Sequence, residues 1–143
     1  PCQLTGILAN PGHFCKVEAS MSDGVRHLKT TRNYDGATED VIIRTEKERQ
    51  VNLMLGANNS IIIGTVSYDN RLVAYDGQCP NCLQDYSGTY FPLSWNKNGL
   101  QLQCGKCSRS YDVNNGVVAS GEGGRQLLTY YASFDGTVLR AWN

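Results

Sequence analysis

The chain has 143 residues, of which 41% are hydrophobic, and its 13 basic residues balance its 13 acidic ones. This length suits one domain, 1–143, with a hydrophobic core of its own. A neutral chain argues against a nucleic-acid surface, which needs an excess of positive charge, and no apolar run approaches the about 20 residues that span a bilayer.

The N-terminal third of the chain has few structural signals. Residues 16–40 are polar and irregular, and only Asp23-Gly24 and Asp35-Gly36 mark turns. The pattern predicts no element there. The β-branched residues 41–43 predict a strand that runs into the charged loop 44–49.

Strand signals dominate the rest of the chain. The predicted hairpins join 59–68 to 71–75 across Asp69-Asn70, 93–95 to 100–103 across 96–99, 111–113 to 117–119 across 114–116, and 127–134 to 137–142 across Asp135-Gly136. Asn, Asp and Gly at the turns tolerate the backbone conformations that hairpins need. Short strands without βαβ alternation predict an all-β fold, an antiparallel sandwich or small barrel.

Four of the six cysteines form two matched pairs. Cys79 and Cys82 lie in C-P-N-C, and Cys104 and Cys107 lie in C-G-K-C, with residues 83–103 between them. A C-x-x-C turn directs both sulfurs toward one point, and two facing turns supply four soft ligands in a tetrahedron, which suits zinc or iron. The spacing is close to that of ribbon-type zinc sites. We therefore predict one metal site, with zinc as the cofactor.

Other uses of these four thiols remain open. They would pair as disulfides in an oxidising compartment, or hold an iron–sulfur cluster. A thioredoxin-type redox pair normally opens a helix in an α/β context, and no segment after Cys82 or Cys107 has a helical pattern.

The two remaining cysteines, Cys2 and Cys15, lie in the N-terminal segment. A disulfide between them would close a small loop and contribute about 3 kcal/mol in the chain-entropy model. Two thiols that do not pair are the alternative, because the bond requires an oxidising compartment. A chain that begins with Pro1 is also expected to be processed or trimmed.

The segments around the two cysteine pairs also form a recognisable pattern. The strand L-V-A-Y-D leads into C-P-N-C, the segment S-R-S-Y-D-V-N-N-G-V-V-A-S-G follows C-G-K-C, and a hairpin with Asp135-Gly136 closes the chain. Together these motifs resemble a Rieske [2Fe–2S] domain, in which a similar strand leads into a C-P-H loop and a similar segment follows a C-x-x-H loop. The resemblance covers 59–143. It implies a Rieske-like framework in which 77–110 is the cysteine-loop subdomain.

The ligands depart from the pattern of that family. Cys79 and Cys104 match its two cysteines, but Asn81 and Cys107 stand where it has histidines. A two-histidine cluster of the family's kind is therefore excluded, and a [2Fe–2S] cluster held by four cysteines would have a ferredoxin-like potential. The resemblance implies a framework whose ligand loops have become zinc-binding turns. In some Rieske proteins an extra cysteine in each loop forms a disulfide. The resemblance is therefore also compatible with a metal-free domain that is held by disulfides.

The altered ligands and asparagine-rich turns also resemble small exported lipoproteins of gut Bacteroidetes. This implies a periplasmic or cell-surface protein with a lipid anchor upstream of the chain; a cytoplasmic protein is the alternative. No catalytic residue is predicted, because neither His13 nor His27 has a motif partner. We interpret Asp76 and Asp85 as solvated turn residues. The predicted function is a non-catalytic Rieske-like binding or structural module whose four cysteines hold a structural zinc. An iron–sulfur electron-transfer protein and an exported, metal-free domain held by disulfides are the alternatives, and the sequence does not identify a protein partner.

Aromatic residues cluster between the two cysteine pairs. They are Tyr86, Tyr90, Phe91 and Trp95. They would form either a platform for a ligand such as a carbohydrate or a small core that covers the four sulfurs. We expect the core, because an insert of this size needs apolar packing of its own.

Overall fold

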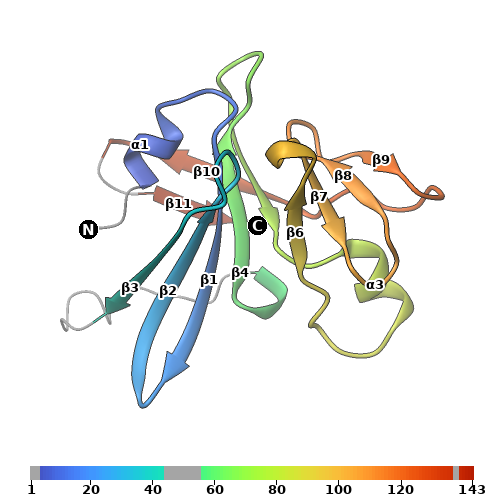
Figure 1. Ribbon diagram of the computed structural model, residues 1–143, viewed down its shortest axis with the longest axis horizontal. Coiled ribbons are helices and arrows are strands. Elements are labelled where there is room, and N and C mark those ends of the chain that lie inside the picture. Colours follow the sequence, from blue (N-terminus) through green and yellow to red (C-terminus); the bar gives the residue numbers. More distant parts are fainter. Residues whose placement is uncertain (1–3, 44–55, 137–138) are drawn as a thin grey trace.

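The computed structural model describes residues 4–43, 56–136 and 139–143, and it shows an all-β fold of two antiparallel sheets (Figure 1). The larger sheet has the strand order β11-β10-β5-β4-β1-β2-β3, and the smaller has the order β6-β7-β8-β9. The predicted fold class is confirmed. Within the described residues, no helix has the length and apolar character that crossing a membrane requires.

The larger sheet contains β1 (Phe14–Ser22), β2 (Val25–Arg32), β3 (Thr38–Ile43), β4 (Ser60–Thr65), β5 (Leu72–Asp76), β10 (Thr129–Phe134) and β11 (Leu139–Trp142). The smaller sheet contains β6 (Leu93–Asn96), β7 (Gln101–Cys104), β8 (Ser110–Asp112) and β9 (Val118–Ser120). The short helices are α1 (Leu4–Leu8), η1 (Gly56–Asn58), α3 (Pro80–Asp85) and η2 (Lys97–Gly99). Figure 1 shows the smaller sheet on one side of the larger, with α3 beside its lower end.

All four predicted hairpins are present, and each joins neighbouring strands of one sheet. The turn at Asp69-Asn70 is longer than predicted. Thr65 pairs with Leu72, and the backbone N–H of Val66 donates to Arg71 across the loop 66–71. Residues 137–138 of the last turn lie outside the described residues, as does the predicted loop 44–49.

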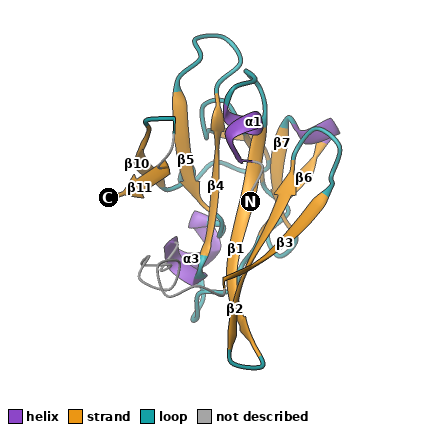
Figure 2. Cartoon of the chain, turned by 90° about the vertical axis from the view of Figure 1, so that its left-hand side faces the viewer, coloured by secondary structure: helices purple, strands orange, loops and turns teal. Residues whose placement is uncertain are grey.

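Residues 16–40, for which the sequence pattern predicted no element, contain most of a long hairpin. Asp23 and Gly24 both have positive φ, 51° and 75°, which makes a two-residue turn of the type that joins β1 to β2. β1 also pairs with β4, and Figure 2 shows the two strands side by side. Residues 14–43 therefore supply three strands of the larger sheet. The predicted Cys2–Cys15 disulfide is not tested, because Cys2 lies outside the described residues.

The central strand β4 separates two apolar cores. All six of its residues are buried. Ile62 packs with Phe14 and Tyr75 toward the smaller sheet, while Ile61 and Ile63 pack on the opposite side. Alternation of side chains along a strand produces this division. The core next to the smaller sheet contains Cys79, Cys82 and Cys104, so the cysteine pairs belong to the interior of the domain.

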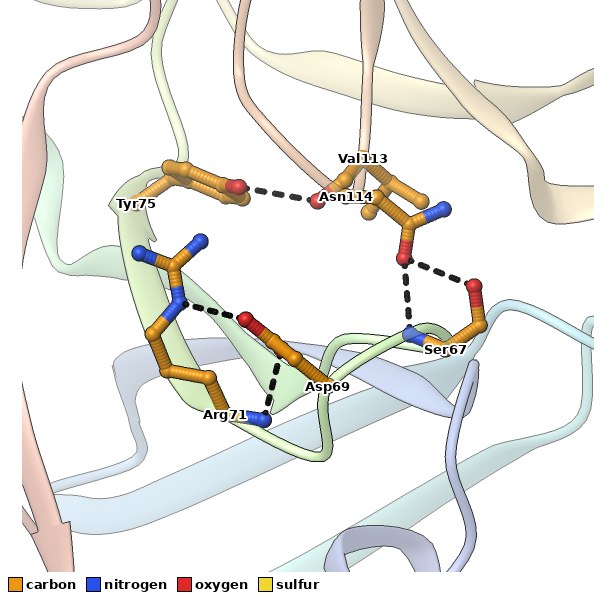
Figure 3. A network of polar contacts seen from close by, with 6 residues as sticks. All are labelled: Ser67, Asp69, Arg71, Tyr75, Val113 and Asn114. Carbon is orange, nitrogen blue, oxygen red and sulfur yellow. Dashed lines mark hydrogen bonds and ion pairs between the residues drawn. The ribbon is translucent and has the colours of Figure 1, made fainter.

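Polar contacts hold the turn after β8 against the larger sheet (Figure 3). The buried hydroxyl of Tyr75 donates to the backbone oxygen of Val113 at 2.9 Å. The side-chain oxygen of Asn114 accepts hydrogen bonds from the backbone and the hydroxyl of Ser67, at 3.1 and 3.3 Å. Asp69 and Arg71 brace the same loop from within. Each sheet thus fixes a turn of the other.

The N-terminal hairpin also supports the smaller sheet. The Asn33 side chain accepts from the backbone of Phe14 and donates to the backbone oxygens of Gly12 and Gly99. The Lys16 ammonium donates to the backbone oxygen of Leu93 at 3.1 Å. Through these contacts, the N-terminal strands support the cysteine-bearing smaller sheet.

Candidate metal centre

The structure brings the four paired cysteines together. Their sulfur atoms all lie within 4.8 Å of one another. The separations are 3.7 Å between Cys79 and Cys107 and 3.7 Å between Cys82 and Cys104. A disulfide bond measures about 2.05 Å, so none of the four sulfurs is bonded to another. The arrangement is a cluster of four thiols of a kind that holds a metal ion.

The first pair lies at the start of α3. Cys79 is the N-cap with extended backbone angles, Pro80 opens the helix, and Cys82 lies in its first turn. The prediction that no helix follows Cys82 was wrong, because a six-residue helix is too short to show a periodic pattern. The expected absence of a helix therefore no longer argues against a redox pair at Cys79 and Cys82. Cys79 and Cys82 are 0% and 1% exposed, however, which keeps oxidants and partner thiols from both sulfurs.

The second pair lies in a tight turn between β7 and β8. Cys104 is the last residue of β7, and its backbone exchanges hydrogen bonds with Ser108 and Arg109. Ser108 has a positive φ of 64°, which closes the turn. Cys107 in the middle of the turn is partly exposed, whereas Cys104 is buried.

Backbone pairing explains why the two turns converge. Gln78 forms a bridge with Pro92, and the backbone N–H of Cys79 donates to the oxygen of Phe91. One step further along, Leu93 pairs with Cys104 in the smaller sheet. The segment 91–93 is thus held between the two cysteine turns. Convergence of the four sulfurs follows from this register.

Asn81, which lies between the two cysteines of the first pair, has a definite orientation. Its side-chain oxygen accepts from the backbone N–H of Arg125 at 2.8 Å. Its amide nitrogen donates to the backbone oxygen of Arg125 at 3.0 Å and to the Tyr111 hydroxyl at 2.8 Å. The amide nitrogen cannot accept a hydrogen bond, so the oxygen of Tyr111 is the acceptor in this contact.

The Tyr111 hydroxyl therefore directs its own proton elsewhere. The Cys79 sulfur lies 3.1 Å from that oxygen and is positioned to receive it. A sulfur that accepts a hydrogen bond in a buried site is best satisfied as a thiolate. The network Arg125–Asn81–Tyr111–Cys79 thus places a hydroxyl group against the Cys79 sulfur. Sequence analysis missed Tyr111 and Asn81 as parts of the site.

Burial opposes that charge. Burial raises the pKa of the Cys79 thiol more than the Tyr111 hydroxyl and nearby backbone N–H groups lower it. Burial also raises the pKa of Cys82, and the sulfurs of Cys104 and Cys107 raise it further. A bound cation would remove this cost of ionisation, since a metal deprotonates a coordinating thiol outright.

Cys107 differs from the other three. Burial raises its pKa, but hydrogen bonds from the backbone and side chain of Arg109, together with those to Cys79 and Cys104, outweigh this and lower the pKa to about 7. Arg109 also donates to the backbone oxygens of Glu122 and Gly123, both at 2.9 Å. It therefore links the second cysteine turn to the glycine-rich segment 120–124. Its positive charge would offset the net negative charge that four thiolates and a divalent cation would give the site.

The two carboxylates near the first cysteine pair have different surroundings. Asp85 is exposed, as predicted. Asp76 is not a solvated turn residue: it is 0% exposed, and its oxygens accept from the backbone of Ala57 and Gln78 and from the Tyr130 hydroxyl. The prediction for Asp76 was wrong because three donors replace the water that a surface carboxylate would bind.

The four aromatic residues between the two cysteine pairs differ in their burial. Phe91 is buried in the core that contains the cysteines, and Trp95 packs against that core. Tyr86 and Tyr90 are 50% and 69% exposed. The Lys106 ammonium lies 4.4 Å from the centre of the Tyr86 ring. Two of the four aromatic residues therefore belong to the core that contains the cysteines, and two do not.

The two histidines lie in other contacts. His13 stacks on Tyr34 with ring centres 3.9 Å apart. His27 lies in β2 and pairs with Asp40 at 3.1 Å. Among the described residues, the only group of three or more potential metal ligands is the four-cysteine cluster.

Comparison with known proteins adds no relative. No protein-family model matches the chain, and neither a curated protein nor a solved structure is significantly similar to it.

Proposed function

We propose that this chain is a non-catalytic Rieske-like domain in which Cys79, Cys82, Cys104 and Cys107 hold one structural zinc ion. The observation that carries the proposal is the sulfur geometry. A tetrahedral zinc with Zn–S bonds of about 2.3 Å places its sulfurs about 3.8 Å apart. The cross-turn separations of 3.7 Å match this value.

The same geometry favours one metal ion over a [2Fe–2S] cluster. In such a cluster two sulfide ions bridge the irons, so the thiolates on one iron are separated from those on the other by the whole cluster. Here every sulfur lies within 4.8 Å of every other. A single iron ion in the same tetrahedron remains the alternative, because four thiolates accept iron as well as zinc. That alternative would be an electron-transfer protein.

The role of the metal would be structural. Three of the four sulfurs are at most 1% exposed, so little of a bound ion would be open to a substrate. Closed four-ligand sites contribute folding free energy, whereas catalytic sites keep an open position. Both cysteine turns and the segment 91–93 between them would depend on the ion.

The Rieske-like part of the proposal is supported by the order of the elements. β5 leads into the first cysteine turn, the second turn lies between β7 and β8, and the β10–β11 hairpin carries Asp135-Gly136. Export to the periplasm or cell surface, with a lipid anchor upstream, is a further proposal that is supported by the resemblance of the sequence to exported lipoproteins. Recovery of the native protein from the cytoplasmic fraction of its host would contradict export.

Metal analysis of protein purified without added metal or chelator tests the central proposal. We expect a colourless protein with one equivalent of zinc. A reddish protein with visible absorbance would show iron, and a metal-free protein without free thiols at Cys79, Cys82, Cys104 and Cys107 would show disulfides instead. Removal of zinc by a chelator should lower the thermal midpoint markedly, and re-addition of zinc should restore it.

A further inference from the structure

The four cysteine residues differ in their exposure to solvent. Cys79, Cys82 and Cys104 are 0%, 1% and 1% exposed. Cys107 is partly exposed, and it lies in a turn whose neighbours Gly105, Lys106 and Ser108 are exposed. A small reagent in solution therefore meets Cys107 first.

The sulfurs are also aligned in pairs across the two turns. Cys107 lies 3.7 Å from Cys79, so the two sulfurs need to approach by less than about 2 Å to reach disulfide distance. Cys79 is held at the start of α3 by its backbone hydrogen bond to Phe91. The turn that carries Cys107 is open to solvent, with no atom within 4 Å of a Cβ placed on Gly105. The movement would therefore come from the second turn.

We propose that Cys107 is an oxidation site at which hydrogen peroxide opens the metal centre, forming a Cys79–Cys107 disulfide and releasing the metal. This inference rests on the proposed function, because it assumes that the four thiolates hold zinc.

The Cys79–Cys107 disulfide forms in two nucleophilic displacements. The Cys107 thiolate attacks one oxygen of peroxide, the O–O bond breaks, hydroxide leaves, and a sulfenic acid forms on Cys107. The Cys79 thiolate then attacks that sulfur, the S–O bond breaks, and a second hydroxide leaves as the disulfide forms. The two thiolates lose two electrons and peroxide gains them, and two protons from solvent convert the hydroxides to water. A zinc ion at the site would then have only Cys82 and Cys104 as ligands and would be released.

The site would thus respond to oxidants through its one accessible ligand. The three buried sulfurs keep the ion bound in reducing conditions, and the exposed turn lets a reductant reverse the bond. Loss of the ion would then loosen both cysteine turns.

The test uses the zinc-loaded chain and one equivalent of hydrogen peroxide, with a colorimetric chelator to follow zinc. Free thiols are alkylated at intervals and disulfides are mapped by peptide mass spectrometry. We expect zinc release to accompany peroxide consumption, with Cys79–Cys107 as the first new bond, and a thiol reductant plus zinc to restore the site. A first bond within one turn, Cys79–Cys82 or Cys104–Cys107, would overturn the inference, as would full zinc retention in excess peroxide.

Two variants of the second turn give a matched comparison. Cys107→Ser and Cys104→Ser each remove one cysteine of the second turn, but only Cys104→Ser retains the partly exposed Cys107. Labelling by a sulfenic-acid probe should be about tenfold slower in Cys107→Ser, and equal rates would contradict the assignment. Zinc content measured before peroxide is added separates the two proposals. A chain that never binds zinc refutes both, whereas a zinc-loaded chain that resists peroxide refutes this inference alone.

Discussion

Asn81 and Arg125 lie 44 residues apart in the chain and form a two-way pair through the side chain of one and the backbone of the other. The carboxamide of Asn81 accepts from the N–H of Arg125 and donates to its oxygen, as a neighbouring strand would. This pair joins the first cysteine turn to the segment 121–125. It also orients the amide that donates to Tyr111, so it sets the hydrogen bonding at Cys79.

The first prediction concerns the glycine next to this pair. Gly124 has a φ of +120°, and a Cβ placed on it would collide with the side-chain oxygen of Asn81. Gly124→Ala should lower the free energy of unfolding by about 1–3 kcal/mol, through backbone strain and loss of the Asn81 contacts. Chemical denaturation measures the change.

Gly123 provides the matched control. A Cβ placed on it meets no atom within 4 Å. Gly123→Ala should change the free energy of unfolding by no more than about 0.5 kcal/mol. Equal effects of the two substitutions would refute the close approach of Gly124 to Asn81.

The second prediction concerns the Tyr111 hydroxyl. Tyr111→Phe removes the donor to the Cys79 sulfur, and it should weaken zinc binding by about 10–100-fold, as loss of an outer-shell partner does. Competition with a chelator of known affinity measures the change. Tyr75→Phe is the matched control, because it also deletes a buried tyrosine hydroxyl, which donates to Val113. It should destabilise the fold and leave zinc affinity unchanged; the same loss of affinity in both variants would exclude a specific role for Tyr111.

The third prediction concerns the Rieske pattern. Asn81→His introduces one of the two histidines that a Rieske centre needs but leaves Cys107 at the position of the other, so it should not produce a Rieske centre after reconstitution with iron and sulfide. It should also destabilise the fold by about 1–3 kcal/mol, because the pair with Arg125 is lost. Visible absorption and electron paramagnetic resonance test the first point, with the unsubstituted chain treated in parallel. A Rieske spectrum from this single variant would contradict the ligand argument.

The fourth prediction is a loss of stability at high pH. Burial raises the pKa of Tyr75, and burial followed by the Asp76 carboxylate raises the pKa of Tyr130. An unfolded tyrosine ionises near about pH 10. The unfolded chain therefore gives up protons that the folded chain retains, so this stability is present below pH 10 and is lost as pH rises through the folded pKa values.

Denaturation midpoints measured between pH 7 and 11 check this trend. Tyr75→Phe should show a shallower decline above pH 10 than the unsubstituted chain, because one of the titrating groups is gone. Parallel declines would show that Tyr75 ionises normally in the folded protein.

The features that could be predicted from the sequence are local. Each C-x-x-C turn positions its own two sulfurs, and Asn-Gly or Asp-Gly turns specify which strands are neighbours. The spacing of the two C-x-x-C motifs predicted that the four cysteines converge, but it did not predict the backbone pairing of the segment 91–93 that brings them together. The six-residue helix α3 is too short to leave a periodic pattern, and Asp76 was misplaced because charged residues are usually exposed.

The N-terminal strands were missed for a different reason. The burial of β1 decreases along the strand, and its last three residues are exposed. Much of the β1–β2 hairpin therefore has no buried face to produce apolar alternation. The roles of Asn81 and Tyr111 depend on contacts across 30 and 44 residues, and no local pattern encodes them.

X-ray absorption at the zinc edge of the protein as purified tests the four-sulfur zinc site most directly. We expect one zinc per chain with four sulfur neighbours at about 2.3 Å and no second metal within bonding range. Nitrogen or oxygen ligands in place of sulfur, or an iron edge with a neighbouring iron, would contradict the account.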